Sequence, residues 1–244
     1  GFNFVTIAAP PHYRAKSEKA LDLAKELGLH CFVAAAPQDY AELAARYPGI
    51  LGFLGPDEPE LNLDTVNFTP ERIAVDYAER KRHYADLPIL ITHSRPQAFD
   101  DYIGTRDLAM TDPYTFGKEY HDINRVEHFV RELRRTSSEA LPCIVILQMY
   151  QLPDGVMRLP SPIEMRCQMF LAAALGVDGI LVYTTATQET VGFHMIDAPE
   201  GRALWESFPE TLRDLRRRLP MYRQTPLAES APLAGPIYWQ LNRD

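Results

Sequence analysis

The chain has 244 residues, of which 46% are hydrophobic, so it can form one large α/β domain or two small ones with a full core. Its formal net charge of -8 at pH 7 argues against a nucleic-acid partner, because phosphates call for a basic surface. No apolar run approaches the roughly 20 residues that span a bilayer, so no membrane span is expected.

Strand-like and helix-like segments alternate along the chain. Strands rich in Val, Ile, Leu and Phe are predicted at 2–9, 31–36, 50–54, 88–92, Leu108–Thr111, 143–149 and 179–184. Helices are predicted at 17–27, 70–84, 122–136, 162–175 and 203–219. Thr69 is expected to cap the second helix, with Pro70 in its first turn. Strict alternation of strand and helix favours a parallel sheet with right-handed crossovers.

Seven strands fit a TIM-type (β/α)8 barrel that lacks or replaces its first β/α unit better than they fit an open sheet. The turn after the first strand, at 8–13, has no Gly-x-Gly-x-x-Gly signature of a dinucleotide-binding fold. We expect the barrel to occupy 1–224 and a Pro/Ala-rich tail to occupy 225–244, with a possible short strand at 237–241. The missing unit exposes a strand edge, which that short strand, a partner chain or an absent segment must cover.

The first residue is Gly1, and no cationic segment followed by an apolar one marks a secretory leader. We therefore expect a processed or excised piece of a longer polypeptide. Cys31, Cys143 and Cys167 form no Cys-x-x-Cys pair and are expected to be buried free thiols. Phosphate-loop, Ser/His/Asp and paired-histidine signatures are missing from the sequence, so neither a cofactor nor a metal is expected.

The apolar run at 50–54 is followed by two adjacent carboxylates, Asp57 and Glu58, and then by Pro59, which stops the strand. Burial beside the strand end raises the pKa of at least one of these carboxyls, because burial disfavours the charged form. A carboxylic acid that stays protonated near neutral pH can protonate the leaving oxygen of a glycoside. The same residues could instead form a surface turn that caps a helix.

Polar or aromatic side chains also stand at the ends of other strands, among them His93, Asp112, Tyr114, Gln148, Tyr150 and Tyr183. In a barrel these ends meet at one rim, where the chemistry of the fold is found. Polar groups and aromatic rings together are the composition of a sugar-binding cleft. Taken singly, His93 could be a structural histidine, Asp112 could start a turn, and the tyrosines could pack at the rim.

The segment Gly52-Phe53-Leu54-Gly55-Pro56-Asp57-Glu58-Pro59 resembles the fourth-strand motif of glycoside-hydrolase-like barrels related to clan A. Segments at 88–92, 110–114, 146–150 and 179–183 resemble the fifth to eighth strands of the same proteins. The resemblance implies a glycoside hydrolase that acts on an oligo- or polysaccharide, with Glu58 as the general acid and no cofactor. It also implies a secreted or periplasmic protein.

Two departures from the family pattern leave the second catalytic group open. Asp57 stands where the family has Asn before its acid, and Gln148 stands where the family has its nucleophilic Glu. Asp112 could act as the second carboxylate. Alternatively, Asp57 could orient a substrate acetamido group that attacks its own anomeric carbon, or Glu189 could swing in from the loop after the last strand.

Two functions of other kinds also stay open. The chain could be a non-catalytic carbohydrate-binding barrel or a scaffold barrel of a larger protein. It could also be a metal-dependent barrel hydrolase that uses His93 and Asp112.

Overall fold

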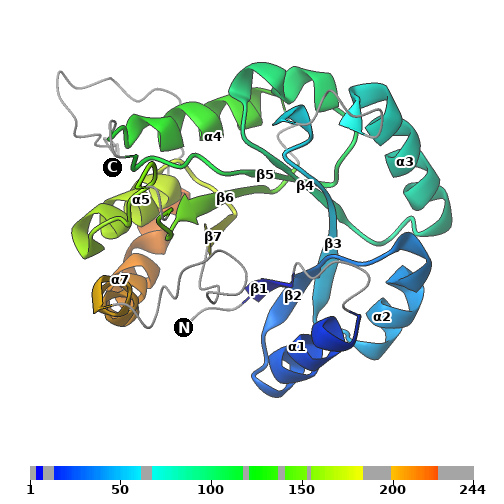
Figure 1. Ribbon diagram of the computed structural model, residues 1–244, viewed down its shortest axis with the longest axis horizontal. Coiled ribbons are helices and arrows are strands. Elements are labelled where there is room, and N and C mark those ends of the chain that lie inside the picture. The colour runs from blue at the N-terminus through cyan, green and yellow to red at the C-terminus, as the bar shows by residue number, and fades with distance from the viewer. Residues whose placement is uncertain are drawn as a thin grey trace. The chain divides into compact units, whose positions relative to one another are not determined.

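The computed structural model describes residues 4–7, 14–61, 68–117, 121–136, 141–152, 155–183 and 199–224. Seven strands follow one another in chain order in one sheet: β1 (Phe4–Ile7), β2 (His30–Val33), β3 (Ile50–Asp57), β4 (Ile89–His93), β5 (Leu108–Thr111), β6 (Cys143–Gln148) and β7 (Gly179–Tyr183). Helices lie in the connections between them, as Figure 1 shows. This order confirms the predicted fold class, a TIM-type barrel that lacks one unit.

The helices are α1 (Arg14–Glu26), α2 (Tyr40–Arg46), α3 (Pro70–His83), α4 (Asn124–Thr136), α5 (Pro162–Ala174) and α7 (Pro199–Gln224). Five of them confirm predicted helices with shifted ends, and Thr69 caps α3 by accepting a hydrogen bond from the Arg72 N–H. The sequence did not predict α2, because seven residues are too few for a helical period to stand out. The short 3-10 helices η2 (Pro37–Asp39), η3 (Pro59–Leu61) and η5 (Pro96–Tyr102) were missed as well.

The chain divides into two compact units, 1–110 with 135–142, and 111–134 with 143–244. In the first unit, β1 to β4 pair with their neighbours in parallel, and α1, α2 and α3 lie on the same side of these strands (Figure 1). Side chains from both layers form its core, where the rings of Tyr40 and Phe53 stack with centroids 3.8 Å apart. Each large apolar side chain buried there contributes about 1.5–3 kcal/mol.

Strand β3 runs three residues further than the predicted end at Leu54. Leu54 pairs with Leu90 but Asp57 pairs with Thr92, so β3 has one residue more than β4 over this stretch and forms a bulge. Glycine allows the close approach of the two strands, because a Cβ at Gly52 would lie 2.8 Å from the carbonyl oxygen of Pro88. Packing therefore explains why Gly52 is a glycine. The bulge sets the direction of the carboxylates that follow.

In the second unit, β6 and β7 pair in parallel, and α5 packs against both β6 and α7. Ser161 caps α5 through a capping box, in which its hydroxyl accepts from the Glu164 N–H and the Glu164 carboxylate accepts from the Ser161 N–H. The Arg158 guanidinium pairs with the same carboxylate at 2.6 Å and lowers the pKa of Glu164 to about 2. Two isolated antiparallel bridges lie in loops of this unit, outside the strands.

The three cysteines are unpaired, as predicted. Cys31 and Cys143 are buried at the starts of β2 and β6, but the expectation of burial is wrong for Cys167, which lies on an exposed position of α5. No described helix is long and apolar enough to cross a membrane. Glu189, the possible strand at 237–241 and the rest of the predicted tail at 225–244 lie outside the described residues.

The close approach of β3 to β4 predicts which of two glycine substitutions destabilises the protein more. Gly52→Ala should lower the free energy of unfolding by about 1–3 kcal/mol, because its Cβ would meet rigid backbone. Gly55→Ala should cost less, since its Cβ would lie 3.0 Å from the Ile91 side-chain Cγ1 and 3.1 Å from the Leu90 carbonyl oxygen, both further away than the Pro88 oxygen is from a Cβ at Gly52. Denaturant unfolding of both variants measures the order. An equal or reversed order would contradict the packing reason for Gly52.

Candidate active site

The carboxyl end of β3 carries the predicted pair of acids. Asp57 is the last residue of the strand, and Glu58 follows with a φ of 45°, which costs a residue other than glycine about 1–2 kcal/mol. Two backbone hydrogen bonds hold this turn: the Glu58 N–H donates to the Thr92 carbonyl at 3.1 Å, and the Leu61 N–H donates to the Glu58 carbonyl at 3.0 Å. Backbone strain of this kind clusters at functional sites, so the turn is the first candidate for chemistry.

The upward pKa shift expected at this strand end is found at Asp57. Partial desolvation of its carboxyl raises the pKa of Asp57, a hydrogen bond from the Thr92 hydroxyl opposes the rise, and the negative charge of Glu60 adds to it. The residue nevertheless keeps access to solvent. Glu58 is half-buried beside it. An acid that is partly desolvated and still accessible is suited to proton transfer.

Glu60, two residues after Glu58, was not among the predicted site residues. Its side chain is buried, with 1% of the residue exposed, and it accepts hydrogen bonds from the backbone N–H groups of Ser94 and Arg95, the latter at 3.0 Å. Its second carboxylate oxygen lies 3.2 Å from Nδ1 of His93. Burial favours a higher pKa, but the hydrogen bonds from His93 and the backbone outweigh it and lower the pKa of Glu60. A Glu that follows a proline gives no sequence signal for such burial.

His93, predicted to bind substrate, is fully buried, and both of its ring nitrogens are engaged. Arg106 Nη1 lies 2.8 Å from Nε2, and a guanidinium can only donate, so Nε2 must accept. The ring proton therefore sits on Nδ1 and is donated to Glu60. Burial lowers the pKa of His93, the hydrogen bond to Glu60 opposes this, and the positive charge of Arg106 adds to it, so the pKa stays below its usual value. This arrangement favours the structural role that the sequence left open.

The same arrangement weakens the metal-dependent alternative. A metal ligand needs a ring nitrogen with an available lone pair, and that of His93 Nε2 already accepts from Arg106. Within the part of the chain that the structure describes, no three His, Cys, Asp or Glu side chains gather in a way that could hold a metal ion.

Gln148, at the end of β6 in the second unit, holds two loops. Its Oε1 accepts from the backbone N–H groups of Thr115 and Phe116 at 3.0 and 2.9 Å. Its Nε2 donates to the carbonyls of Phe116, Tyr150 and Arg158 at 2.9, 3.3 and 2.8 Å. The side chain is completely buried, so this amide organises backbone and does not present a polar group to a ligand.

Three of the predicted substrate-binding residues are brought together in the second unit. The rings of Tyr114 and Tyr150 meet edge to face with centroids 5.0 Å apart, and Tyr183 lies 5.6 Å from Tyr150 and 6.3 Å from Tyr114. Tyr183 is 42% exposed, whereas Tyr150 is nearly buried. Only Tyr183 thus offers a large part of its surface to solvent, as a sugar-stacking ring must.

Asp112, the predicted second carboxylate, also belongs to the second unit and is buried. Its carbonyl accepts from the Tyr114 N–H at 2.8 Å, so the residue starts a tight turn after β5. Asp57 and Glu58 belong to the first unit. The pairing of Asp112 with Glu58 in one reaction stays a prediction.

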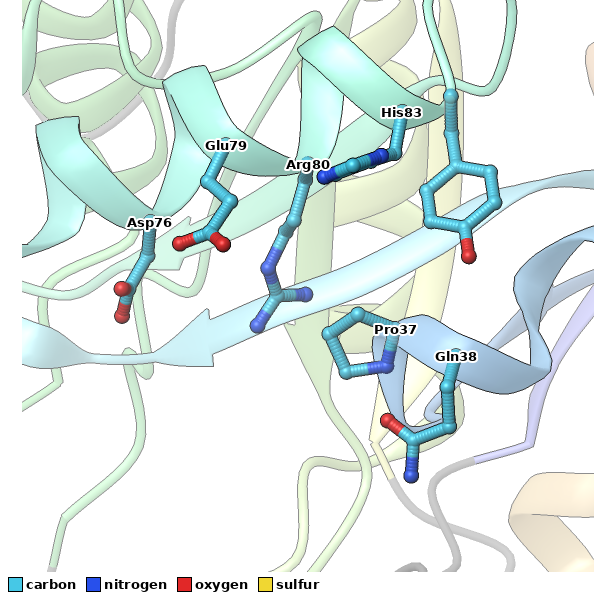
Figure 2. Close-up of a pocket in the computed structure, with 7 residues that line it drawn as sticks. Pro37, Gln38, Asp76, Glu79, Arg80 and His83 are labelled. Atoms are coloured by element: carbon cyan, nitrogen blue, oxygen red, sulfur yellow. The ribbon is translucent and has the colours of Figure 1, made fainter.

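A groove of about 480 Å³ lies on the helix layer of the first unit, between η2 and α3. Figure 2 shows Asp76, Glu79 and Arg80 extending from α3, with Arg80 directed toward Pro37. Arg80 donates a hydrogen bond to the Tyr40 hydroxyl, and Asp76 forms an ion pair with Arg72. Arg80 and Asp76 are thus each engaged with another side chain of the first unit, so the strand end, rather than this groove, is the stronger candidate for chemistry.

The fold is similar to those of several carbohydrate-active enzymes. A glycoside hydrolase family 17 β-1,3-glucanosyltransferase from Rhizomucor miehei has a TM-score of 0.55 and 12% identity, with 75% of each chain covered. A putative α-L-fucosidase from Bacteroides thetaiotaomicron has a TM-score of 0.54 and 11% identity, with 92% of this chain and 83% of that chain covered. A β-glucuronidase from Ruminococcus gnavus has a TM-score of 0.58 and 13% identity, with 86% and 43% covered.

These likenesses show the fold alone, a TIM-type barrel similar to those of glycoside hydrolases, as the sequence resemblance implied. They do not bear on the Asp-Glu-Pro motif. The chain spans less than half the length of the glucuronidase that it matches. No protein-family model matches the chain, and no curated protein matches it.

The buried histidine gives a pH prediction. His93 should stay neutral with its proton on Nδ1 at pH values below the usual histidine pKa of about 6.5. Below that pH the unfolded chain binds a proton that the folded chain does not, so the free energy of unfolding should fall as the pH drops from 6.5 toward the folded-state pKa. Imidazole ¹⁵N titration measures the pKa, and denaturant unfolding at pH 7.5 and 5.5 measures the linkage. A ring that titrates at or above 6.5 would refute the neutral state assigned to His93 below that pH.

The buried amide gives a charge prediction. Gln148→Glu should lower the free energy of unfolding by about 2–4 kcal/mol, because a carboxylate oxygen would face three carbonyl oxygens. Gln151→Glu makes the same change on a half-buried neighbour and serves as the control. Equal stability of the two variants in denaturant unfolding at pH 7 would show that the amide has no bracing role.

Proposed function

We propose that the chain is a glycoside hydrolase that acts on an oligo- or polysaccharide by general acid/base catalysis, with Glu58 as the acid. The observation that carries this proposal is the carboxylate pair at the end of β3, held in a strained turn after a bulge. The fold shared with glycoside-hydrolase barrels supports it. Sugars are therefore the proposed substrates.

In the proposed reaction, Glu58 donates its proton to the glycosidic oxygen as the bond from that oxygen to the anomeric carbon breaks. Asp112 is the proposed second carboxylate, which either attacks the anomeric carbon or takes a proton from the attacking water. Asp57 is the alternative acid, because its pKa is raised. It is also the group that would orient a substrate acetamido nucleophile if Asp112 takes no part.

The tyrosines of the second unit are the proposed sugar platform. An exposed Tyr183 ring, held edge to face by Tyr150, presents an apolar face of fixed orientation. Pyranose faces pack on such rings. Gln148 and His93 act in this proposal by holding loops and strand ends in place.

A second candidate is a carbohydrate-binding or scaffold barrel without turnover. It is favoured by Gln148, which occupies the position where the resembling family has its nucleophile and whose amide is fully engaged with backbone. A chain without that carboxylate can retain a sugar platform while lacking chemistry. The two candidates differ in turnover and share affinity for sugar.

Glu58→Gln separates these candidates. In the glycosidase, this change should lower kcat/KM on a responsive aryl glycoside or oligosaccharide about 10²–10⁴-fold, while affinity for the sugar is kept. Asp112→Asn should also reduce turnover with little loss of stability. Asp100→Asn, which removes a charge from an exposed ion pair with Arg135, is the matched control.

Three other outcomes would each contradict one part of the proposal. Turnover that survives Glu58→Gln but is lost in Asp57→Asn makes Asp57 the acid. Turnover that survives Asp112→Asn removes Asp112 from the mechanism. A parent chain that binds sugars in calorimetry and cleaves none across the panel supports the second candidate.

A further inference from the structure

The turn that carries Asp57 and Glu58 is tied to the end of β4 by a side chain from its own continuation. Glu60 lies in η3, directly after the turn, and its carboxylate reaches the first two backbone N–H groups beyond β4, those of Ser94 and Arg95. Without these hydrogen bonds, two polar groups next to the barrel strand would lose their acceptor. The carboxylate thus joins the β3 turn to the β4 end.

The hydrogen bonds around this carboxylate run in one direction. Arg106 donates to His93 Nε2, His93 Nδ1–H donates to Glu60, and the remaining carboxylate oxygen accepts from the backbone. A glutamine at position 60 could keep its oxygen on the backbone, but its NH₂ group would then face the Nδ1–H. Moving the ring proton to Nε2 would set that proton against Arg106. A carboxylate is therefore the group that satisfies every partner in the chain.

The charge of Glu60 also acts on one of the two acids, Asp57. It acts as well on Tyr102, whose pKa is raised to about 12 by burial and neighbouring acids. The titratable side chain that hydrogen-bonds to Glu60 is that of His93, and Arg106 in turn donates to His93. Replacing buried ionic groups by apolar ones often stabilises a protein, so a buried carboxylate is weak evidence for stability and needs another reason.

We infer that Glu60 is a positioning residue, which fixes the Asp57–Glu58 turn on the end of β4. The inference rests on the proposed function only in giving Asp57 and Glu58 a chemical role. The hydrogen-bonded frame and the charge are features of the folded chain itself.

The test is a ¹³C carboxyl titration of Asp57 in the full chain, with the parent, Glu60→Gln and Asp100→Asn compared. Glu60→Gln should shift the pKa of Asp57 downward, because a negative charge next to it is lost. Asp100→Asn removes an equal charge from the surface of the same unit and should leave Asp57 as in the parent. A folded Glu60→Gln protein with the parent value for Asp57 overturns the inference.

Two further measurements make the outcome decisive. If Glu60→Gln does not fold, Glu60→Asp keeps the charge on a shorter stem, and it should retain an upward shift at Asp57; loss of that shift overturns the inference. Where the parent cleaves a glycoside, Glu60→Gln should reduce kcat/KM about tenfold or more and displace the pH profile. If the parent has no turnover but Glu60→Gln shifts the pKa of Asp57, the proposed function alone is refuted. If Glu60→Gln leaves both the pKa of Asp57 and the turnover unchanged, the positioning role alone is refuted.

Discussion

The buried carboxylate of Glu60 is the constraint on which the candidate site depends. It lies where the turn after β3 meets the end of β4, and its partners are a neutral histidine and two backbone N–H groups. Because Arg106 fixes the histidine tautomer, the whole chain of donors has one arrangement. That arrangement holds a turn in which Glu58 adopts a left-handed backbone conformation, and strain of this kind persists only where the surroundings over-determine it.

In both units a buried side chain provides hydrogen-bond partners for backbone groups near the end of a strand, but the side chains differ in charge. In the first unit, the ionised carboxylate of Glu60 accepts hydrogen bonds from backbone N–H groups at the end of β4. In the second, the neutral amide of Gln148 does so, accepting from two N–H groups and donating to three carbonyls. A neutral amide suits a place with donors and acceptors on both sides, whereas a carboxylate suits a place with donors alone. The choice of Gln at position 148 therefore has a local reason that is independent of catalysis.

The strand-end pattern in the sequence located Asp57, Glu58 and the three tyrosines, because an apolar run that ends in polar residues can be recognised from the sequence alone. The pattern could not show which way each side chain points in the fold. Glu60 reads as an ordinary acid after a proline, and only the tertiary fold brings it against β4. The position of Gln148 was predicted, but four of its five backbone partners come from segments that local sequence does not connect to it. The bulge in β3 also escaped prediction, since register is set between strands.

The most direct test of this account is a crystal structure of the chain with a bound oligosaccharide. The account predicts a glycosidic oxygen within about 2.6–3.2 Å of a carboxyl oxygen of Glu58, or of Asp57 if that residue is the acid. Glu60 should keep its hydrogen bonds to the end of β4 in the complex. A sugar bound in the groove along α3, with neither strand-end carboxyl in reach of a glycosidic oxygen, would contradict it.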